Sequence, residues 1–327
     1  MLSFVDLFCG AGFGARGAVD AGARPLLGVD SWDLATETFR ANFPGSEVKS
    51  QRVEELDPWR LRNKYLPDVL LASPECTSHS IARGAKPGCE RSRETALSIR
   101  PWVEAMRPRW LVIENVNRMK SWARHGELVE FLEDSGYRIS DLFLNAADFG
   151  APQSRKRMFL LCDREGTATT RQDLFEYGGG PRLSAAAILD KENRYPSKPL
   201  FRAGRAEATI ARAERAIQAL GQGNPFLIVY YGSDYAGGWQ RLDAPLRTVT
   251  TLDRFGLVSW SGRTPYLRML QPDELVRAMC GRSNHLLPHG TRRQKIRLCG
   301  NGICAPVTKA IFKRIRHLSQ QPMRKAS

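Results

Sequence analysis

Residues 3–14 read SFVDLFCGAGFG, in which a short apolar run, Ser3–Phe8, passes directly into the glycine-rich stretch Gly10-Ala11-Gly12-Phe13-Gly14. The run has the length and composition of a buried strand, and the residues from Ala15 to Ala21 are typical of a helix. Glycines between a strand and a helix let the backbone approach a ligand closely, and the helix N-terminus offers free N–H groups. The segment therefore predicts the first unit of an α/β sheet, with a ligand-binding turn at its carboxyl edge.

The same alternation continues through the first half of the chain. Further apolar runs that predict strands are Pro25–Asp30, Pro67–Ala72 and Trp110–Glu114, with a β-rich stretch at Tyr137–Cys162. Helical patterns lie between them, at Trp32–Asn42, at Arg93–Met106 (kinked or divided at Pro101) and at Glu127–Asp134. Strands that alternate with helices predict βαβ units and a mostly parallel sheet. We therefore expect a Rossmann-like α/β domain for catalysis and cofactor binding over residues 1–170.

After about Glu165 this alternation stops. The stretch Arg202–Leu220 predicts a single basic helix, and Pro272–Cys280 and Ala305–Leu318 predict two more. Strands are predicted at Phe226–Tyr231, Leu246–Thr251 and Phe255–Trp260, with glycine turns between them. We expect a smaller, irregular domain over residues 171–295 and a C-terminal segment, 296–327, that returns to the first domain.

The net charge of +15 belongs entirely to the second half. Residues 1–165 carry 23 basic and 23 acidic side chains, whereas residues 166–327 carry 26 basic and 11 acidic ones. This asymmetry indicates a polyanionic partner that the second half binds. The chain has no run of about 18 apolar residues, so we expect no membrane span. Seven cysteines without CxxC spacing favour a reducing cytoplasm over a disulfide scaffold or a zinc site, and we expect no metal.

Reactive side chains directly follow three of the predicted strands. Asp30 lies about 20 residues after the glycine turn, where a carboxylate either accepts hydrogen bonds from a ribose or caps the next helix. Cys76 follows Ser73-Pro74-Glu75, and Glu114 ends the run WLVIE. Carboxyl ends of parallel strands share one edge of a sheet, so we expect these residues to face one crevice. Cys76 is either an ordinary loop cysteine or a nucleophile whose pKa its neighbours lower.

A basic segment, Gln153-Ser154-Arg155-Lys156-Arg157, leads into the apolar run MFLLC. Strand alternation puts Arg155 and Arg157 on the same side. The two guanidinium groups then either grip a phosphate or a base carbonyl, or lie on a solvated edge strand.

Taken together and in this order, these motifs resemble the DNA (cytosine-5) methyltransferase family. VDLFCGAG at 5–12 is similar to the family's cofactor loop, and Ser73-Pro74 followed by Cys76 is similar to its nucleophile loop. Residues 114–116 match its Glu-Asn-Val element, and LNAADFGAPQSRKR at 144–157 matches its Gln-x-Arg-x-Arg segment. The later family elements follow in order, as APLRTVTTLDRFGLV at 244–258, YLRMLQPDELVRAMCG at 266–281 and CGNGICAPVTKAI at 299–311. The resemblance covers nearly the whole chain and implies a class I methyltransferase fold with a small target-recognition domain.

The resemblance also implies a reaction, namely transfer of a methyl group from S-adenosylmethionine to C5 of cytosine in duplex DNA, on a flipped-out base. Cys76 would bond covalently to C6, Glu114 would hydrogen-bond N3 and the exocyclic amine, and Arg157, with Arg155, would hold the base carbonyl. The implied cofactor residues are Phe8, Gly10, Ala11, Gly12, Asp30, Pro74 and Asn301. We expect a monomeric, cytoplasmic enzyme of a restriction-modification, phage or orphan system.

The chain departs from the family pattern at three places. The usual Pro-Cys-Gln reads Glu75-Cys76-Thr77, and a carboxylate beside the thiol disfavours the thiolate unless it pairs with a cation. Candidate cations in the same stretch are Arg83, Lys86, Arg91 and Arg93. Phe13 replaces a glycine, and Arg52 stands where the family has an aspartate for the adenine amine. These departures leave open a modified cofactor or a catalytically inactive DNA-binding relative, and a tRNA cytosine-C5 methyltransferase is the alternative enzyme.

Target recognition is expected in the basic segment 166–243. Arg202, Arg205, Arg212 and Arg215 form either a solvated helix face or a set of phosphate contacts, which position a protein without specifying sequence. Arg83 and Lys86 are further candidates for contact with the nucleic acid. The recognised bases do not follow from these residues.

Overall fold

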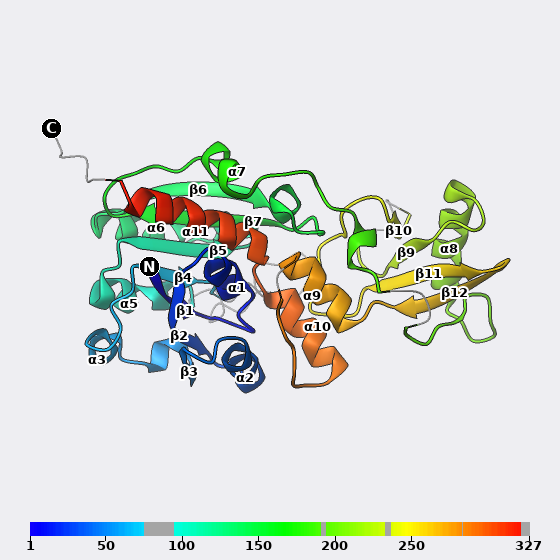
Figure 1. The fold of residues 1–327 in the computed structure, drawn as a ribbon, viewed down its shortest axis with the longest axis horizontal. Coiled ribbons are helices and arrows are strands. Elements are labelled where there is room, and N and C mark those ends of the chain that lie inside the picture. The colour runs from blue at the N-terminus through cyan, green and yellow to red at the C-terminus, as the bar shows by residue number, and fades with distance from the viewer. Residues whose placement is uncertain (75–94, 191–193, 233–236, 283, 322–327) are drawn as a thin grey trace.

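The computed structural model describes residues 1–74, 95–190, 194–232, 237–282 and 284–321 (Figure 1). The predicted nucleophile Cys76 lies outside the described residues, and so do its neighbours Glu75 and Thr77 and the basic residues Arg83, Lys86, Arg91 and Arg93. Among the described residues, no helix combines the length and apolar composition that a membrane span requires.

A seven-stranded sheet forms the larger part of the molecule (Figure 1). Its strand order is β3-β2-β1-β4-β5-β7-β6, and β7 alone runs antiparallel to its neighbours. The bounds are β1 Ser3–Leu7, β2 Arg24–Asp30, β3 Glu47–Ser50, β4 Val69–Ala72, β5 Trp110–Asn115, β6 Arg138–Asn145 and β7 Lys156–Asp163. The predicted α/β fold with a mostly parallel sheet is confirmed. The ends of β1, β2, β4 and β5 meet at one edge, where the site is built.

Helices cover both faces of this sheet, because successive residues of a strand point to opposite sides. Phe4 and Leu71 join one core with Phe312, whereas Val5 and Leu70 join the other. The helices are α1 Phe13–Asp20, α2 Asp33–Asn42, α3 Pro58–Arg62, α5 Arg100–Met106, α6 His125–Asp134, α7 Arg171–Gly178 and α11 Ala305–Ser319. A short 3-10 turn precedes α5, and Pro101 lies in the first turn of that helix, so the predicted division at this proline is correct.

A second sheet of five antiparallel strands lies at the other end of the molecule (Figure 1). Its order is β10-β9-β11-β12-β8, with bounds β8 Lys198–Pro199, β9 Phe226–Val229, β10 Trp239–Arg241, β11 Phe255–Ser261 and β12 Thr264–Met269. Helix α8, Glu207–Leu220, packs Ala213 and Ala216 against Phe226 and Ile228. The smaller part predicted from the sequence is therefore present and is built on an antiparallel sheet.

In the second half of the chain, one predicted helix begins at the wrong residue and one predicted strand is not formed. The basic helix begins at Glu207 rather than Arg202, because Gly204 takes a left-handed conformation with φ +74° in the turn before it. Residues 246–251 do not form a strand either. Leu246 makes a single bridge to Gln153, the hydroxyl of Thr248 donates to the carbonyl oxygen of Ser154, and the backbone of Val249 bonds to the side chains of Gln153 and Arg155.

Helices α9, Pro272–Cys280, and α10, Arg292–Asn301, lie between the two sheets, and the chain then returns as α11 (Figure 1). Helix α11 packs against α1 at very short range. A Cβ placed at Gly17 would overlap the carbonyl oxygen of Ala305 and lie 2.8 Å from the backbone nitrogen of Lys309. The five described cysteines are buried and unpaired, as expected for small apolar residues.

Candidate active site

The glycine turn after β1 has the backbone geometry that the sequence predicts. Gly10 and Gly12 have φ of +52° and +83°, a region that glycine enters without strain. Gly12 is the N-cap of α1, and no side chain caps the helix. The first N–H groups of α1 are therefore not used by a capping side chain, and Gly10 and Ala11 lie beside a positive helix end.

Asp30 holds this turn to the end of β2. One carboxylate oxygen accepts a hydrogen bond from the backbone N–H of Gly10 at 2.9 Å, and the other accepts one from Trp32, also at 2.9 Å. The N-cap of α2 is Trp32, and among the described residues no side chain caps this helix, so the alternative in which Asp30 caps the next helix is wrong. An ionised carboxylate has about four acceptor positions, and ligand binding by Asp30 stays a prediction.

The C-terminal end of α10 is brought beside the same turn. Asn301 is the last residue of α10 and is exposed. The following Gly302 abuts α1, because a Cβ at that position would lie 2.6 Å from the ring of Phe13. The structure thus brings Asn301 close to the start of α1, 288 positions away from Phe13 in the sequence.

Glu114 lies at the carboxyl end of β5 and is only 7% exposed. Its Oε1 forms an ion pair with Nε of Arg157 at 3.2 Å, but no donor among the described residues makes a well-formed hydrogen bond to this buried oxygen. Burial raises the pKa of Glu114, and the positive charges of Arg157 and Arg155 oppose this shift. The carboxyl group therefore keeps a proton to higher pH than an exposed glutamate does.

Asn115, the next residue, ties this strand end to β4. Its side-chain amide donates to the carbonyl oxygen of Pro74 at 3.3 Å, and its side-chain oxygen accepts from the backbone of Val116 at 2.8 Å. No role for Asn115 was predicted from the sequence, in which its place in the Glu-Asn-Val element is the only signal. Asn115 fixes the last described residue before the segment that contains Cys76.

Arg155 is not arranged as predicted. It lies just before β7, is 4% exposed, and donates to the carbonyl oxygens of Val249 at 2.9 Å and Gly300 at 2.8 Å. The neighbouring Gln153 accepts from the backbone N–H of Val249 at 2.7 Å. The two guanidinium groups therefore do not grip one ligand side by side. Arg155 joins three chain segments, while Arg157 faces Glu114.

The amino-acid sequence matches a known protein family. The sequence model of the C-5 cytosine-specific DNA methylase family matches residues 2–317. The chain belongs to this family.

Curated methyltransferases of the same family resemble the chain over different lengths. The Type II methyltransferase M.HgiDI of Herpetosiphon aurantiacus is 31% identical over 165 residues, which are 50% of this chain and 52% of that protein. M.NlaX of Neisseria lactamica is 25% identical over 329 residues, covering 97% of this chain and 96% of that one. The chain spans about half the length of several curated relatives that it matches, among them M.HgiDI.

Solved structures of two methyltransferases have the same fold. The Schizosaccharomyces pombe Dnmt2 methyltransferase superimposes with a TM-score of 0.70 at 18% identity, covering 98% of this chain and 99% of that one. A putative DNA modification methyltransferase from an Escherichia coli prophage gives a TM-score of 0.68 at 16% identity, with 98% and 100% covered.

The arginines predicted to contact DNA do not share a helix face. Arg202 is exposed and lies before α8, and Arg205 donates to the carbonyl oxygen of Pro199 at 2.9 Å. Within α8, the guanidinium of Arg212 lies 5.8 Å from the ring centroid of Tyr230, and Arg215 donates to the carbonyl oxygen of Gly237 at 3.0 Å. Their contact with phosphate stays a prediction.

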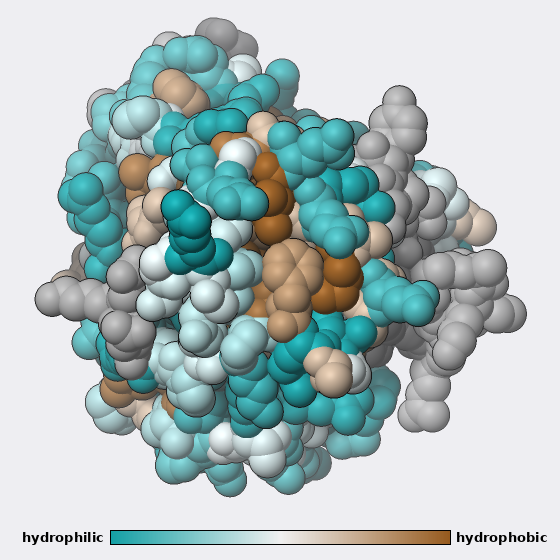
Figure 2. Space-filling view, turned by 90° about the vertical axis from the view of Figure 1, so that its right-hand side faces the viewer, coloured by the Kyte–Doolittle hydropathy of each residue, from teal (hydrophilic) through white to brown (hydrophobic). Residues whose placement is uncertain are grey.

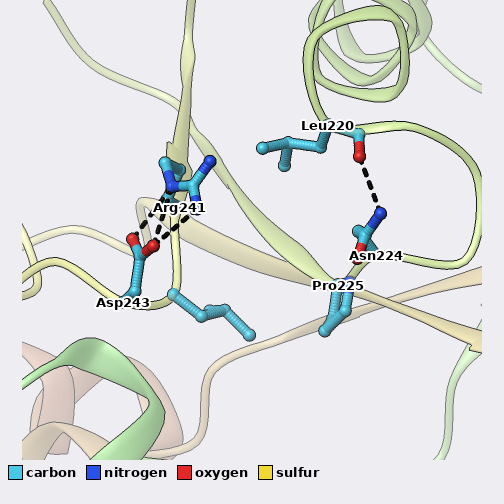
Figure 3. Close-up of a pocket in the computed structure, with 6 residues that line it drawn as sticks. Leu220, Asn224, Pro225, Arg241 and Asp243 are labelled. Atoms are coloured by element: carbon cyan, nitrogen blue, oxygen red, sulfur yellow. Dashed lines mark hydrogen bonds and ion pairs between the residues drawn. The ribbon is translucent and has the colours of Figure 1, made fainter.

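Two hollows on the small sheet lie far from Glu114 in the fold. A cavity of about 230 Å³ separates the end of α8 from β9 and β10, and its polar residues bond to one another, with Arg241 on Asp243 and Asn224 on the carbonyl oxygen of Leu220 (Figure 3). Figure 2 looks onto this end of the molecule, where apolar side chains gather at the centre of a hydrophilic surface. A second hollow of about 380 Å³ is lined by Phe201, Glu214, Ile217, Gln218, Gln222, Trp260, Arg263 and Pro265. Neither brings together catalytic groups.

A segment between α9 and α10 docks against the end of α2 and the start of α1. Asn42 accepts a hydrogen bond from the backbone N–H of Leu286 at 2.9 Å and donates one to its carbonyl oxygen at 2.8 Å. The buried ring of His285 stacks on Phe13, with the ring centroids 4.4 Å apart. Neither ring nitrogen makes a well-formed hydrogen bond. No local sequence pattern predicts the contacts of Leu286 and His285 with Asn42 and Phe13.

The burial of His285 makes stability depend on pH. Desolvation lowers the pKa of His285 to about 3, the positive charge of Arg16 adds to the fall, and contact with the backbone of Ala11 opposes it. In the unfolded chain the imidazole has a pKa of about 6.5. Below this pH the unfolded chain binds a proton that the folded chain does not bind. We expect the unfolding free energy to fall by about 2 kcal/mol between pH 7 and pH 5 from this residue alone.

Urea unfolding at both pH values tests this expectation, with His285→Phe as the comparison, because phenylalanine keeps the stacking on Phe13 and cannot be protonated. The variant should lose about 2 kcal/mol less than the wild type over this interval. Equal losses in the two proteins would contradict the assignment.

Proposed function

We propose that this protein transfers a methyl group from S-adenosylmethionine to C5 of cytosine in duplex DNA. The observation that carries the proposal is Glu114, a buried carboxyl group at the carboxyl edge of a parallel sheet, with a raised pKa and an Oε1 that lacks a hydrogen-bond donor among the described residues. A base with an acceptor ring nitrogen beside an exocyclic amine offers the partners that such a group requires. Family membership makes cytosine that base.

The residues around the glycine turn fit an adenosyl cofactor. The positive end of α1 suits the cofactor's carboxylate, and the Asp30 carboxylate suits ribose hydroxyls. Phe8 directly follows β1, and Ala11, Gly12, Pro74 and Asn301 complete the proposed contacts. When bound, the cofactor supplies an electrophilic methyl group on a sulfonium.

The protein's own groups would then act on the base. The thiolate of Cys76 forms a bond to C6, which makes C5 nucleophilic, and Cys76 leaves after C5 has gained the methyl group and lost its proton. Glu114 donates to N3 and accepts from the amine, so that it stabilises the negative charge that develops on the ring. Arg157 holds the base carbonyl and keeps Glu114 oriented. Arg155 acts through position, since its guanidinium is bound to two backbone carbonyls.

Duplex DNA is the substrate that the charge favours. The excess of basic residues after residue 165 supplies a salt-dependent contact with phosphates, to which we assign Arg202, Arg205, Arg212 and Arg215 together with Arg83 and Lys86. A target atom inside the duplex is unreachable, so the base must be flipped out. We also propose that residues 1–170 and 296–327 form the catalytic domain and that residues 171–295 recognise the target.

Covalent capture tests the proposal directly. Incubation with S-adenosylmethionine and duplex DNA containing 5-fluorocytosine should give a stable protein–DNA adduct, because fluorine at C5 blocks the final elimination. The adduct should be absent with Cys76→Ala, and Cys162→Ala, which changes a cysteine buried in β7, should retain it.

The DNA pool should contain random sequence, because the recognition site is unknown. Bisulfite sequencing of DNA from cells that express the protein would then supply the site. No adduct on any duplex pool would refute the proposed function. Stronger methyl acceptance by tRNA would reassign the substrate, and the mass of the modified base identifies the group transferred.

A further inference from the structure

Phe8 has an unusual backbone conformation at the entrance to the cofactor turn. Among the described residues, only Phe8, with φ +58°, and Arg107, with φ +42°, are non-glycine residues in the left-handed region. Arg107 ends a helix, where this conformation is common. For an aromatic residue at a strand end the conformation is costly, and it persists only where the surroundings hold it.

Two neighbouring strands hold the backbone around Phe8. From β2, the carbonyl oxygen of Val29 accepts the N–H of Cys9 at 2.9 Å. From β4, the next residue, Ser73, donates its backbone N–H to the carbonyl oxygen of Leu7 at 3.2 Å and its hydroxyl to the carbonyl oxygen of Phe8 at 3.0 Å. The hydroxyl bond orients the peptide that follows Phe8, so it bears directly on the strained conformation.

The side chain of Phe8 is partly buried and packs against the core that contains Leu7. Its direction depends on the backbone twist at its own Cα. If φ returned to the extended region, the ring would leave this packing. The hydroxyl of Ser73 therefore bears on the position of the ring through the backbone of Phe8.

We propose that Ser73 is a positioning residue for cofactor binding, whose hydroxyl holds Phe8 in the left-handed conformation that presents its ring to the cofactor's adenine. This inference rests on the proposed function, because it takes the ligand at the turn to be an adenosyl cofactor. It adds Ser73, which lies between the end of β4 and the proposed cofactor residue Pro74, to the residues at the ends of β1, β2 and α10.

Calorimetric titration with S-adenosylhomocysteine measures the effect without turnover. Ser73→Ala should weaken binding about fivefold, which corresponds to one hydrogen bond. Ser73→Thr, which keeps the hydroxyl, should restore the affinity. The matched control is Ser135→Ala, because the Ser135 hydroxyl donates to the carbonyl oxygen of Phe131 in a similar bond, at 2.7 Å, at the end of α6. In kinetics, KM for the cofactor should rise while kcat changes less than about twofold.

A double-mutant cycle separates positioning from general stability. Glycine adopts positive φ without strain. In the Phe8→Gly variant the backbone at position 8 therefore does not depend on the Ser73 hydroxyl. In the Phe8→Gly background, Ser73→Ala should change the affinity by less than about twofold. An equal loss in both backgrounds, or no loss in the wild-type background, would overturn the inference. If the wild-type protein failed to bind S-adenosylhomocysteine, the proposed function itself would fail, which is a different result.

Discussion

Glu114→Gln is expected to lower kcat by at least about 100-fold while DNA and cofactor binding survive. Glutamine keeps the shape of the side chain and can hydrogen-bond the base, but it carries no transferable proton. The charge that develops on the ring when Cys76 adds to C6 then has no acid beside it. The substitution also leaves the Arg157 guanidinium without its ionic partner at 3.2 Å.

Steady-state kinetics with separate measurement of DNA and cofactor affinity check this expectation. Glu127→Gln is the control, because Glu127 also pairs with arginines, Arg100 and Arg124, but at the surface. It should leave kcat unchanged. Wild-type activity should decline as the pH rises through the raised pKa of Glu114. The residual activity of Glu114→Gln should not show this decline, because glutamine does not titrate. Near-normal turnover in Glu114→Gln would refute the role.

Gly17→Ala is expected to destabilise the folded protein by about 3 kcal/mol or more. The added methyl group would overlap the carbonyl oxygen of Ala305, and backbone atoms cannot rotate aside as a flexible side chain would. Helices α1 and α11 would have to separate, which opens the core that contains Phe4 and Phe312. Chemical denaturation measures the loss.

The matched control is Gly126→Ala, since Gly126 is also a helical glycine and a Cβ there meets nothing within 4 Å. This change should stabilise α6 by about 0.5–1 kcal/mol, because alanine is the better helix former. The same substitution in two helices thus has opposite expected signs. Equal effects would show that the close approach of α1 and α11 is not the cause.

The parts of the fold that the sequence could predict depend on local signals. The apolar runs, the glycine turn after β1 and the start of α9 at Pro272 follow from periodicity and from residues with special backbone preferences, and the structure confirms them. Asp30 and Glu114 were found because each ends a strand at the edge where ligands bind. Their distances to one another and their catalytic roles stay predictions, as does the role of Cys76.

The features that the sequence could not predict depend on distant partners. Arg155 belongs to a motif that suggests ligand contact, but its partners lie 94 and 145 positions away, at Val249 and Gly300. The apolar pattern of residues 246–251 predicts a strand that the structure does not form. Instead of a neighbouring strand, the side chains of Gln153 and Arg155 supply hydrogen bonds to this segment. The docking of His285 on Phe13 likewise joins residues with no local pattern.

The contact between α1 and α11 also orders events during synthesis. Protein chains fold from the N-terminus as they leave the ribosome, and β1 and α1 emerge long before residue 305. Until α11 arrives, the face of α1 around Gly17 and the ring of Phe4, which Phe312 meets edge-on at 5.4 Å, stay exposed to water and available to chaperones. An interrupted translation product would carry α1 without the helix that packs against it. The arrival of α11 is therefore the step that completes the packing around α1.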